Sequence, residues 1–197
     1  MRGLIVLLVL AIAVGAGGWR GGEWYARKRL AEPSTSTADA IANGQWRTTV
    51  QAGRADADPL VKARIARNGI LALSRKETQY YGSYDIAPGE PYDSRCDYRV
   101  VGRDPPTRWW SLTLYDGVWY IDNPADRSSF NKYNVEREAD GGFVINVSPT
   151  PKEKNWLPST GAKNMRFALR LYNPEDAVRD HLDTVELPRF EKAEGCR

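Results

Sequence analysis

Three aspartates and their polar neighbours offer the most direct route to catalysis in this chain. Asp116, Asp122, Asn123, Asp126 and Arg127 lie close together in the sequence, around an expected hairpin. Carboxylates that meet at the edge of a sheet can act as general acid and base, or can bind calcium. The spacing matches no calcium loop, and Asp-Gly and Asn-Pro are ordinary turn sequences. We therefore expect turn residues here, with a hydrolase-type enzyme that uses Asp and Glu as the alternative.

A second set of side chains could bind a ligand without catalysis. Trp156 could stack on a sugar while Asn155 hydrogen-bonds to it, or Trp156 could plug one end of the fold while Asn155 caps a turn. Arg166 and Arg170 fall on one face of an expected strand, where they could hold an anionic ligand or pair with acids on a neighbouring strand. The ligand-binding candidates are Trp109, Tyr115, Asn155, Trp156, Arg166 and Arg170.

The chain supplies little else for catalysis. His181 is the single histidine, so a serine nucleophile such as Ser111 or Ser148 would have to use it as the base. No serine stands in a G-x-S-x-G turn, and one histidine cannot make a histidine-rich metal site. We expect a surface histidine, assign no catalytic residue, and expect no metal or cofactor. The formal net charge of +3, from 28 basic and 25 acidic residues, gives no electrostatic case for nucleic acid.

The N-terminus points to a membrane. Residues 4–14 form an unbroken apolar run, and residues 1–19 suit either a transmembrane anchor or a signal segment. Trp19 and Trp24 would fit the membrane interface, where aromatic rings collect. The basic cluster Arg27-Lys28-Arg29 favours a cytoplasmic C-terminal side on the positive-inside rule.

The two cysteines favour the opposite side of the membrane. Cys96 and Cys196 make an even count, and a disulfide between them would require an oxidising compartment. The alternative is two unrelated thiols. We expect the disulfide, and with it a single-pass protein of a bacterial-type inner membrane whose C-terminal domain lies in the periplasm, or is exported after signal cleavage.

The elements that must position these side chains are mostly strands. We expect a linker over 20–44, with a short helix at 37–43, and a helix over 59–74 that starts after an Asp58 cap. Its apolar side would include Ile65, Ile70 and Leu71, and its wet side Arg64. Alternating strands are expected at 45–51, 78–86, 96–101, 109–115, 118–121, 142–148 and 166–172. Residues 45–197 should form a mainly β domain, an antiparallel β-sandwich preceded by one amphipathic helix and the membrane segment.

Three ordered blocks of this domain carry a family resemblance. They are WSLTLYD at 110–116, NWLP at 155–158 and LRLY at 169–172. With these blocks, the chain from about Trp46 to Cys196 resembles the family catalogued as domain of unknown function 1214. The resemblance implies a jelly-roll-like β-sandwich and an uncharacterised function, and it supplies no active-site residues.

Three functions remain open from the sequence. The first is a non-catalytic binding or scaffolding module of the envelope, with a glycan or protein partner, which an exposed groove of Trp109, Tyr115 and Trp156 would favour. The second is an enzyme that acts on an envelope polymer. The third is a structural subunit of an envelope complex. We expect the first.

Overall fold

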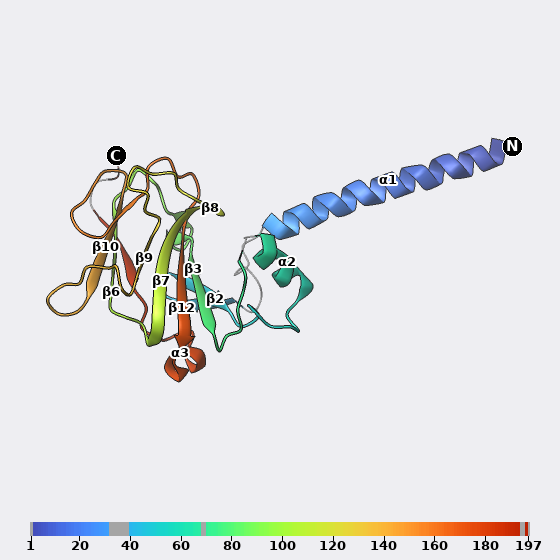
Figure 1. Ribbon diagram of the computed structural model, residues 1–197. Coiled ribbons are helices and arrows are strands. Elements are labelled where there is room, and N and C mark those ends of the chain that lie inside the picture. The colour runs from blue at the N-terminus through green and yellow to red at the C-terminus, as the bar shows by residue number, and fades with distance from the viewer. Residues whose placement is uncertain (1, 32–39, 68–69, 194–195, 197) are drawn as a thin grey trace.

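A long N-terminal helix projects from a two-sheet body in the computed structural model, which describes residues 2–31, 40–67, 70–193 and 196 (Figure 1). This helix is α1 (Arg2–Ala31). Its stretch Ile5–Leu30 is long and apolar enough to cross a membrane. Its apolar side chains are exposed, with Val14 at 73% and Trp19 at 77%. A helix that leaves its apolar side chains exposed in this way is typical of a membrane segment.

The larger sheet holds the two longest strands at its centre. Its strand order is β1-β2-β3-β12-β7-β8, and β9 also pairs with β7. All of its neighbouring strands are antiparallel. The strands are β1 (Ala40–Asn43), β2 (Trp46–Thr49), β3 (Thr78–Ser83), β7 (Thr107–Asp116), β8 (Trp119–Tyr120), β9 (Ser129–Asn131) and β12 (Met165–Pro174).

The smaller sheet has the order β11-β10-β6-β13. Its strands are β6 (Tyr98–Gly102), β10 (Phe143–Ser148), β11 (Trp156–Pro158) and β13 (Arg189–Lys192), and a separate pair joins β4 (Asp85–Ala87) to β5 (Glu90–Pro91). The β10–β11 pair is parallel, which departs from the all-antiparallel expectation. The mainly β class with antiparallel sheets is confirmed, and the jelly-roll connectivity stays a prediction.

The core lies between the two sheets. Leu112 and Leu169 are fully buried, as the alternating patterns of their strands predict. The Trp110 ring stacks on Phe143 of the other sheet with centroids 4.9 Å apart. The Phe167 ring packs in a tilted arrangement against Phe190, with centroids 4.6 Å apart. Side chains that interdigitate across both sheets make them one packed unit, which holds the opposite face of β12 in a fixed position.

A disulfide joins Cys96 to Cys196, as predicted from the even cysteine count. The two Cα atoms are 4.1 Å apart, and 100 positions separate the cysteines in the sequence. The bond holds Cys196, beyond the last strand, against the turn that leads into β6.

The helix α2 (Pro59–Arg67) follows β1 and β2 and is shorter than expected. The predicted cap is confirmed: Asp58 Oδ1 accepts the backbone N–H of Leu60 at 2.8 Å. The helix ends at Arg67 instead of residue 74, so the prediction of its C-terminal half was wrong, and Leu71 is 88% exposed. Residues 68–69, within the expected helix, lie outside the described residues.

Two further expectations were wrong. Residues 40–43 form the strand β1, not part of a helix over 37–43, because they pair with β2 across the Gly44 turn. Residues 37–39 lie outside the described part. Arg64, placed on the wet side of α2, is only 2% exposed. Its Nε and Nη2 donate to the carbonyl oxygen of Arg29 at 2.9 and 2.8 Å, so it caps the C-terminal end of α1.

Candidate functional site

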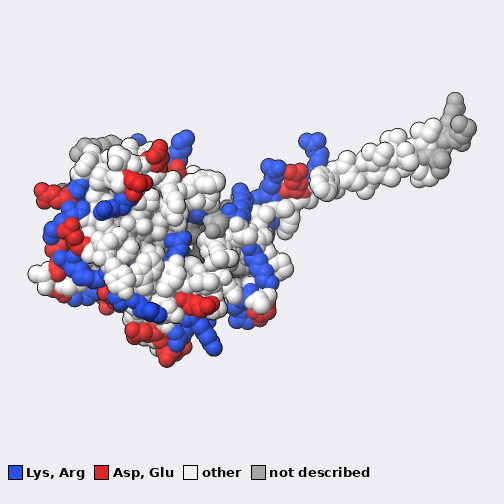
Figure 2. Space-filling view, viewed as in Figure 1, with Lys and Arg blue, Asp and Glu red and all other residues white. Residues whose placement is uncertain are grey.

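A cavity of about 380 Å³ lies on the outer face of the larger sheet, away from the core. Strands β3, β7 and β12 form its floor, and α2, the segment after it and the β7–β8 hairpin form its walls. Figure 2 shows the surface hollowed between the body of the sheets and the part that carries α2. We call this cavity the arginine-tyrosine pocket, after its polar lining of Tyr80, Tyr84, Tyr115, Tyr120, Arg166 and Arg170.

The alternation of β12 places both arginines in this pocket. Phe167 and Leu169 point into the core, so Arg166, Ala168 and Arg170 share the opposite face. Ala168 lies between the arginines and pairs with Gly82 on β3. These two small residues leave space above the centre of the sheet. A Cβ added to Gly82 would lie 2.8 Å from Tyr84 Oη, so this glycine also lets the Tyr84 ring fold back over the strand.

The two guanidinium groups differ in how they are held. Arg170 donates from Nη2 to Tyr115 Oη at 2.8 Å and from Nη1 to Thr113 Oγ1 at 3.2 Å. Arg166 lies over the Tyr115 ring, with its guanidinium carbon 5.8 Å from the ring centroid. Burial lowers the pKa of Arg166 from its usual range, with the nearby Arg170 acting in the same direction. Tyr84 and Tyr115 act in the opposite direction, and Arg166 donates no hydrogen bond within the described residues.

No carboxylate neutralises these arginines within the described residues. The pocket lining contains no Asp or Glu there, and neither arginine takes part in an ion pair of that part of the chain. The cross-strand ion pair that the sequence offered as an alternative is therefore not formed there. Two half-buried positive charges in a pocket without a counter-charge favour an anionic ligand.

Aromatic rings form the wall and the mouth of the pocket. Tyr115 stacks on Tyr120 with centroids 5.2 Å apart and planes 17° apart. The neighbouring Tyr115 hydroxyl raises the pKa of Tyr120, and burial raises it to a smaller degree. Trp119 and Tyr120 are 77% and 67% exposed at the mouth. Sequence reasoning missed these two residues, although the Asp116-Gly117 turn signal places them directly beside Tyr115.

The structure brings together only three of the six predicted ligand-binding residues: Tyr115, Arg166 and Arg170. Trp109 instead packs on Tyr172, with centroids 5.0 Å apart, beyond the pocket lining. The expected groove of Trp109, Tyr115 and Trp156 is not formed, because Trp156 belongs to the other sheet.

Asn155 and Trp156 serve the packing of the smaller sheet. The Asn155 amide donates to the carbonyls of Glu136 and Val144 at 2.7 and 2.9 Å, and its Oδ1 accepts from the Glu136 N–H at 2.7 Å. Trp156 Nε1 donates to the Ser148 carbonyl at 3.1 Å. A buried amide with three backbone partners has little capacity left for a ligand.

The acidic cluster has turn functions. Asp116 Oδ1 accepts the backbone N–H groups of Lys163 and Asn164 at 3.1 and 2.8 Å. Asn123 Oδ1 accepts that of Arg127 at 3.1 Å within its own turn. His181 is exposed after α3 (Asp176–Asp180). The Asn123 contact is the turn chemistry that the sequence predicts, whereas Asp116 binds a segment 47 positions away.

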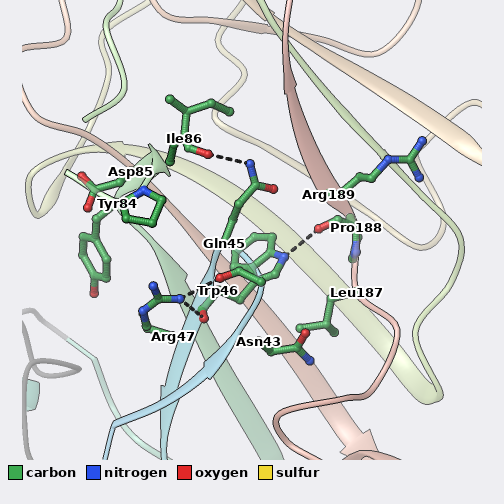
Figure 3. Close-up of a pocket in the computed structure, with 13 residues that line it drawn as sticks. Asn43, Gln45, Trp46, Arg47, Tyr84, Asp85, Ile86, Leu187, Pro188 and Arg189 are labelled. Atoms are coloured by element: carbon green, nitrogen blue, oxygen red, sulfur yellow. Dashed lines mark hydrogen bonds between the residues drawn. The ribbon is translucent and has the colours of Figure 1, made fainter. Parts of the chain in front are cut away.

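A second cavity, of about 370 Å³, lies beside β2 and the segment before β13 (Figure 3). The side chains of Gln45, Trp46 and Arg47 donate to backbone carbonyls of its own walls. Gln45 Nε2 donates to the Ile86 carbonyl at 2.9 Å, and Trp46 Nε1 donates to the Pro188 carbonyl at 2.6 Å (Figure 3). These bonds connect the beginning of β2 to β4 and to the segment before β13. We therefore interpret this cavity as a structural contact between these segments and not as a ligand site.

Comparison with known proteins places the chain among uncharacterised relatives. A family described as "Protein of unknown function (DUF1214)" matches residues 77–176. The solved VPA0106 protein from Vibrio parahaemolyticus is 24% identical, with a TM-score of 0.57 over 71% of this chain and 36% of that chain. An uncharacterized protein from Burkholderia cenocepacia is 18% identical, with a TM-score of 0.41 over 61% of this chain and 30% of that chain. No curated protein matches. The Vibrio protein shares the fold of this chain. This chain spans about a third of the length of the Vibrio protein.

Proposed function

The chain belongs to the DUF1214 family of proteins of unknown function, and from that premise we propose that it is a non-catalytic binding module for an anionic ligand. One observation carries the proposal: Arg166 and Arg170 line an aromatic pocket in which the described residues supply no carboxylate. Arginine binds phosphate and carboxylate groups through paired N–H donors, and the tyrosine rings can stack on an apolar part of the ligand.

The lining favours binding over hydrolysis. Glycoside hydrolysis needs two carboxyl groups about 5–10 Å apart in one site. The described residues of the arginine-tyrosine pocket offer guanidinium, phenol and apolar groups instead. Its volume of about 380 Å³ falls within the usual range of small-ligand sites.

We also propose that α1 anchors the protein as a single-pass segment in a bacterial-type inner membrane, with the sheets in the periplasm. The Cys96–Cys196 disulfide supports an oxidising compartment. The cluster Arg27-Lys28-Arg29 argues for the opposite orientation. An alkaline phosphatase reporter at the C-terminus, which is active only outside the cytoplasm, decides between them: activity is expected, and an inactive, full-length fusion would refute the periplasmic placement.

The binding test uses the full chain in phosphatidylcholine nanodiscs and phenyl phosphate as the probe. This probe joins a phosphate to one aromatic ring and is freely soluble. We expect saturable heat of binding by titration calorimetry. A charge-assisted hydrogen bond contributes about 1.5–3 kcal/mol, so loss of each arginine should weaken binding about 10- to 150-fold.

The matched control is Arg189→Met, at the second cavity, where Arg189 pairs with Glu191. We expect the double variant Arg166→Met/Arg170→Met to lose the probe and Arg189→Met to keep it. Equal binding by the wild type and the double variant would place the anion elsewhere and refute the assignment of the pocket.

A further inference from the structure

The arginine-tyrosine pocket combines two chemistries in one space. Arg166 and Arg170 lie on its floor, whereas α2 and the segment after it contribute the apolar side chains of Ile65 and Ile70. The β7–β8 hairpin adds Trp119 on the opposite wall. A ligand that matches both parts has an anionic head and an apolar remainder.

The pocket is joined to the membrane segment through α2. Arg64 binds the carbonyl oxygen of Arg29 near the end of α1, and the next residue, Ile65, lines the pocket. Figure 1 shows α2 lying directly beside the C-terminal end of α1. This contact fixes the pocket close to the point where the chain leaves the apolar span.

The side chains along the end of α1 mark the level of the bilayer surface. Trp19 and Trp24 are 77% and 64% exposed, and aromatic rings of this kind collect at membrane interfaces. From Trp24 to Arg29 the helix rises about 1.5 Å per residue, or roughly 8 Å. The α2 contact therefore lies within about the depth of the head-group region.

The mouth of the pocket also exposes apolar groups. Trp119 is 77% exposed, and Leu71, which follows the lining residue Ile70, is 88% exposed. Exposure of Trp and Leu side chains to water is unfavourable, and their burial at a lipid surface is favourable. Lys28 and Arg29 at the end of α1 would also concentrate anionic lipids at this point.

We propose that the arginine-tyrosine pocket takes up the phosphate head group of an anionic membrane phospholipid, which enters from the bilayer that holds α1. The phosphate lies between Arg166 and Arg170, and the first part of the acyl chains lies along Ile65, Ile70 and Trp119. A cavity of about 380 Å³ holds the head of such a lipid but not its whole length, so the chain ends remain in the bilayer. This inference rests on the proposed function and names its ligand class.

The test uses the full chain in nanodiscs of phosphatidylcholine mixed with phosphatidylglycerol, and native mass spectrometry after release from the discs. We expect the wild type to retain one phosphatidylglycerol more than the Arg166→Met/Arg170→Met variant. Lipid held by α1 alone remains in both samples and cancels in the comparison. Arg189→Met should behave as the wild type, and Trp119→Ser should retain phosphatidylglycerol at least several-fold less.

A second arm separates a lipid from a free phosphate ester. In discs of phosphatidylcholine alone, glycerol 3-phosphate is added in solution, and we expect it to bind at least 10-fold more weakly than phenyl phosphate. Tighter binding of glycerol 3-phosphate, with no retained phosphatidylglycerol, would overturn the lipid as the ligand. If the double variant does not fold, phenyl phosphate should still displace the retained lipid from the wild type, and a failure to displace it refutes the inference.

The two proposals fail differently. If phenyl phosphate binds through the arginines but phosphatidylglycerol is not retained, the lipid inference falls and the binding module stands. If neither binds, both fall.

Discussion

Replacing each pocket arginine by methionine should affect stability in different ways. Methionine keeps much of the length of arginine and removes its charge and its donors. Arg170 donates to Tyr115 Oη and Thr113 Oγ1, at 2.8 and 3.2 Å. Arg166 makes only its ring contact with Tyr115 among the interactions of the described residues. The structure therefore predicts that Arg170 contributes to folding and that Arg166 is held ready for a ligand.

The magnitudes follow from these contacts. Arg170 makes two hydrogen bonds, at about 0.5–1.5 kcal/mol each, and also lies over the Tyr115 ring, a contact worth about 0.5–1 kcal/mol. Arg170→Met should therefore lose about 1.5–4 kcal/mol, which for a chain of this size is a fall in Tm of about 3–16 °C. Arg166→Met removes a cation–π contact worth about 0.5–1 kcal/mol, and it also removes a half-buried charge without a counter-charge. We expect its Tm to be unchanged or raised.

The lowered pKa of Arg166 determines how the effect of Arg166→Met on stability depends on pH. Burial lowers this pKa below its value in the unfolded chain, so the charge opposes folding while the arginine is protonated. That opposition is relieved only as pH rises through the folded pKa, far above neutrality. The difference in Tm between Arg166→Met and the wild type should therefore be constant from about pH 6 to about pH 9.

The assay is thermal unfolding of the full chain in phosphatidylcholine nanodiscs, followed by near-ultraviolet circular dichroism with the disulfide intact. Arg189→Met serves as the control for loss of an exposed arginine. A fall in Tm for Arg166→Met as large as that for Arg170→Met would show that Arg166 has a structural partner. Arg166 would then not be available to bind a ligand.

Three further predictions test the frame of the pocket. Reduction of Cys96–Cys196, which closes a loop of 100 positions, should remove about 4–5 kcal/mol from the free energy of unfolding; an unchanged denaturant midpoint would contradict this. Asn155→Leu should lower the free energy of unfolding by about 2–4 kcal/mol, because it removes three hydrogen bonds to the backbone, and should leave the affinity for phenyl phosphate unchanged. A loss of affinity would show that Asn155 belongs to the binding site. Gly53→Ala should lower the free energy of unfolding by more than about 1 kcal/mol and weaken phenyl phosphate binding. Gly53 has a φ of +74°, and an added Cβ would overlap the Leu73 carbonyl beside the pocket wall. An unaltered Tm would contradict this close approach.

The regular part of the fold could be predicted because its signals are local. Alternation of apolar and polar residues predicts that Leu112 and Leu169 are buried and that Arg166 and Arg170 share the other face. The Asp116-Gly117 turn predicts the β7–β8 hairpin, and Gly117 has a φ of +60° as such turns require.

The pocket itself could not be predicted, because it depends on contacts between distant segments. Arg64 has the residue type of a solvated helix face, and it is buried because the end of α1 offers it a carbonyl acceptor. That contact helps to hold α2 at the edge of the pocket. Ala168 and Gly82 meet only through the pairing of β12 with β3, so nothing in either local sequence shows the space above them.

The partial success with the site residues has the same origin. Tyr115, Arg166 and Arg170 were predicted from strand faces, and the registry of β7 with β12 brings them together. Asn155 was predicted to bind a ligand from its residue type, but its amide hydrogen-bonds to the backbone of Glu136 and Val144. Side-chain chemistry predicts what a residue can bind, and only the fold decides which partner reaches it first.

An anion bound between Arg166 and Arg170 can be located by anomalous X-ray diffraction from crystals of the full chain grown with 4-bromophenyl phosphate. We expect a bromine peak between β12 and α2, near Trp119, with the phosphate in hydrogen-bond distance of both guanidinium groups. A bromine peak in the cavity beside Gln45, or no ordered probe at a saturating concentration, would contradict this binding site.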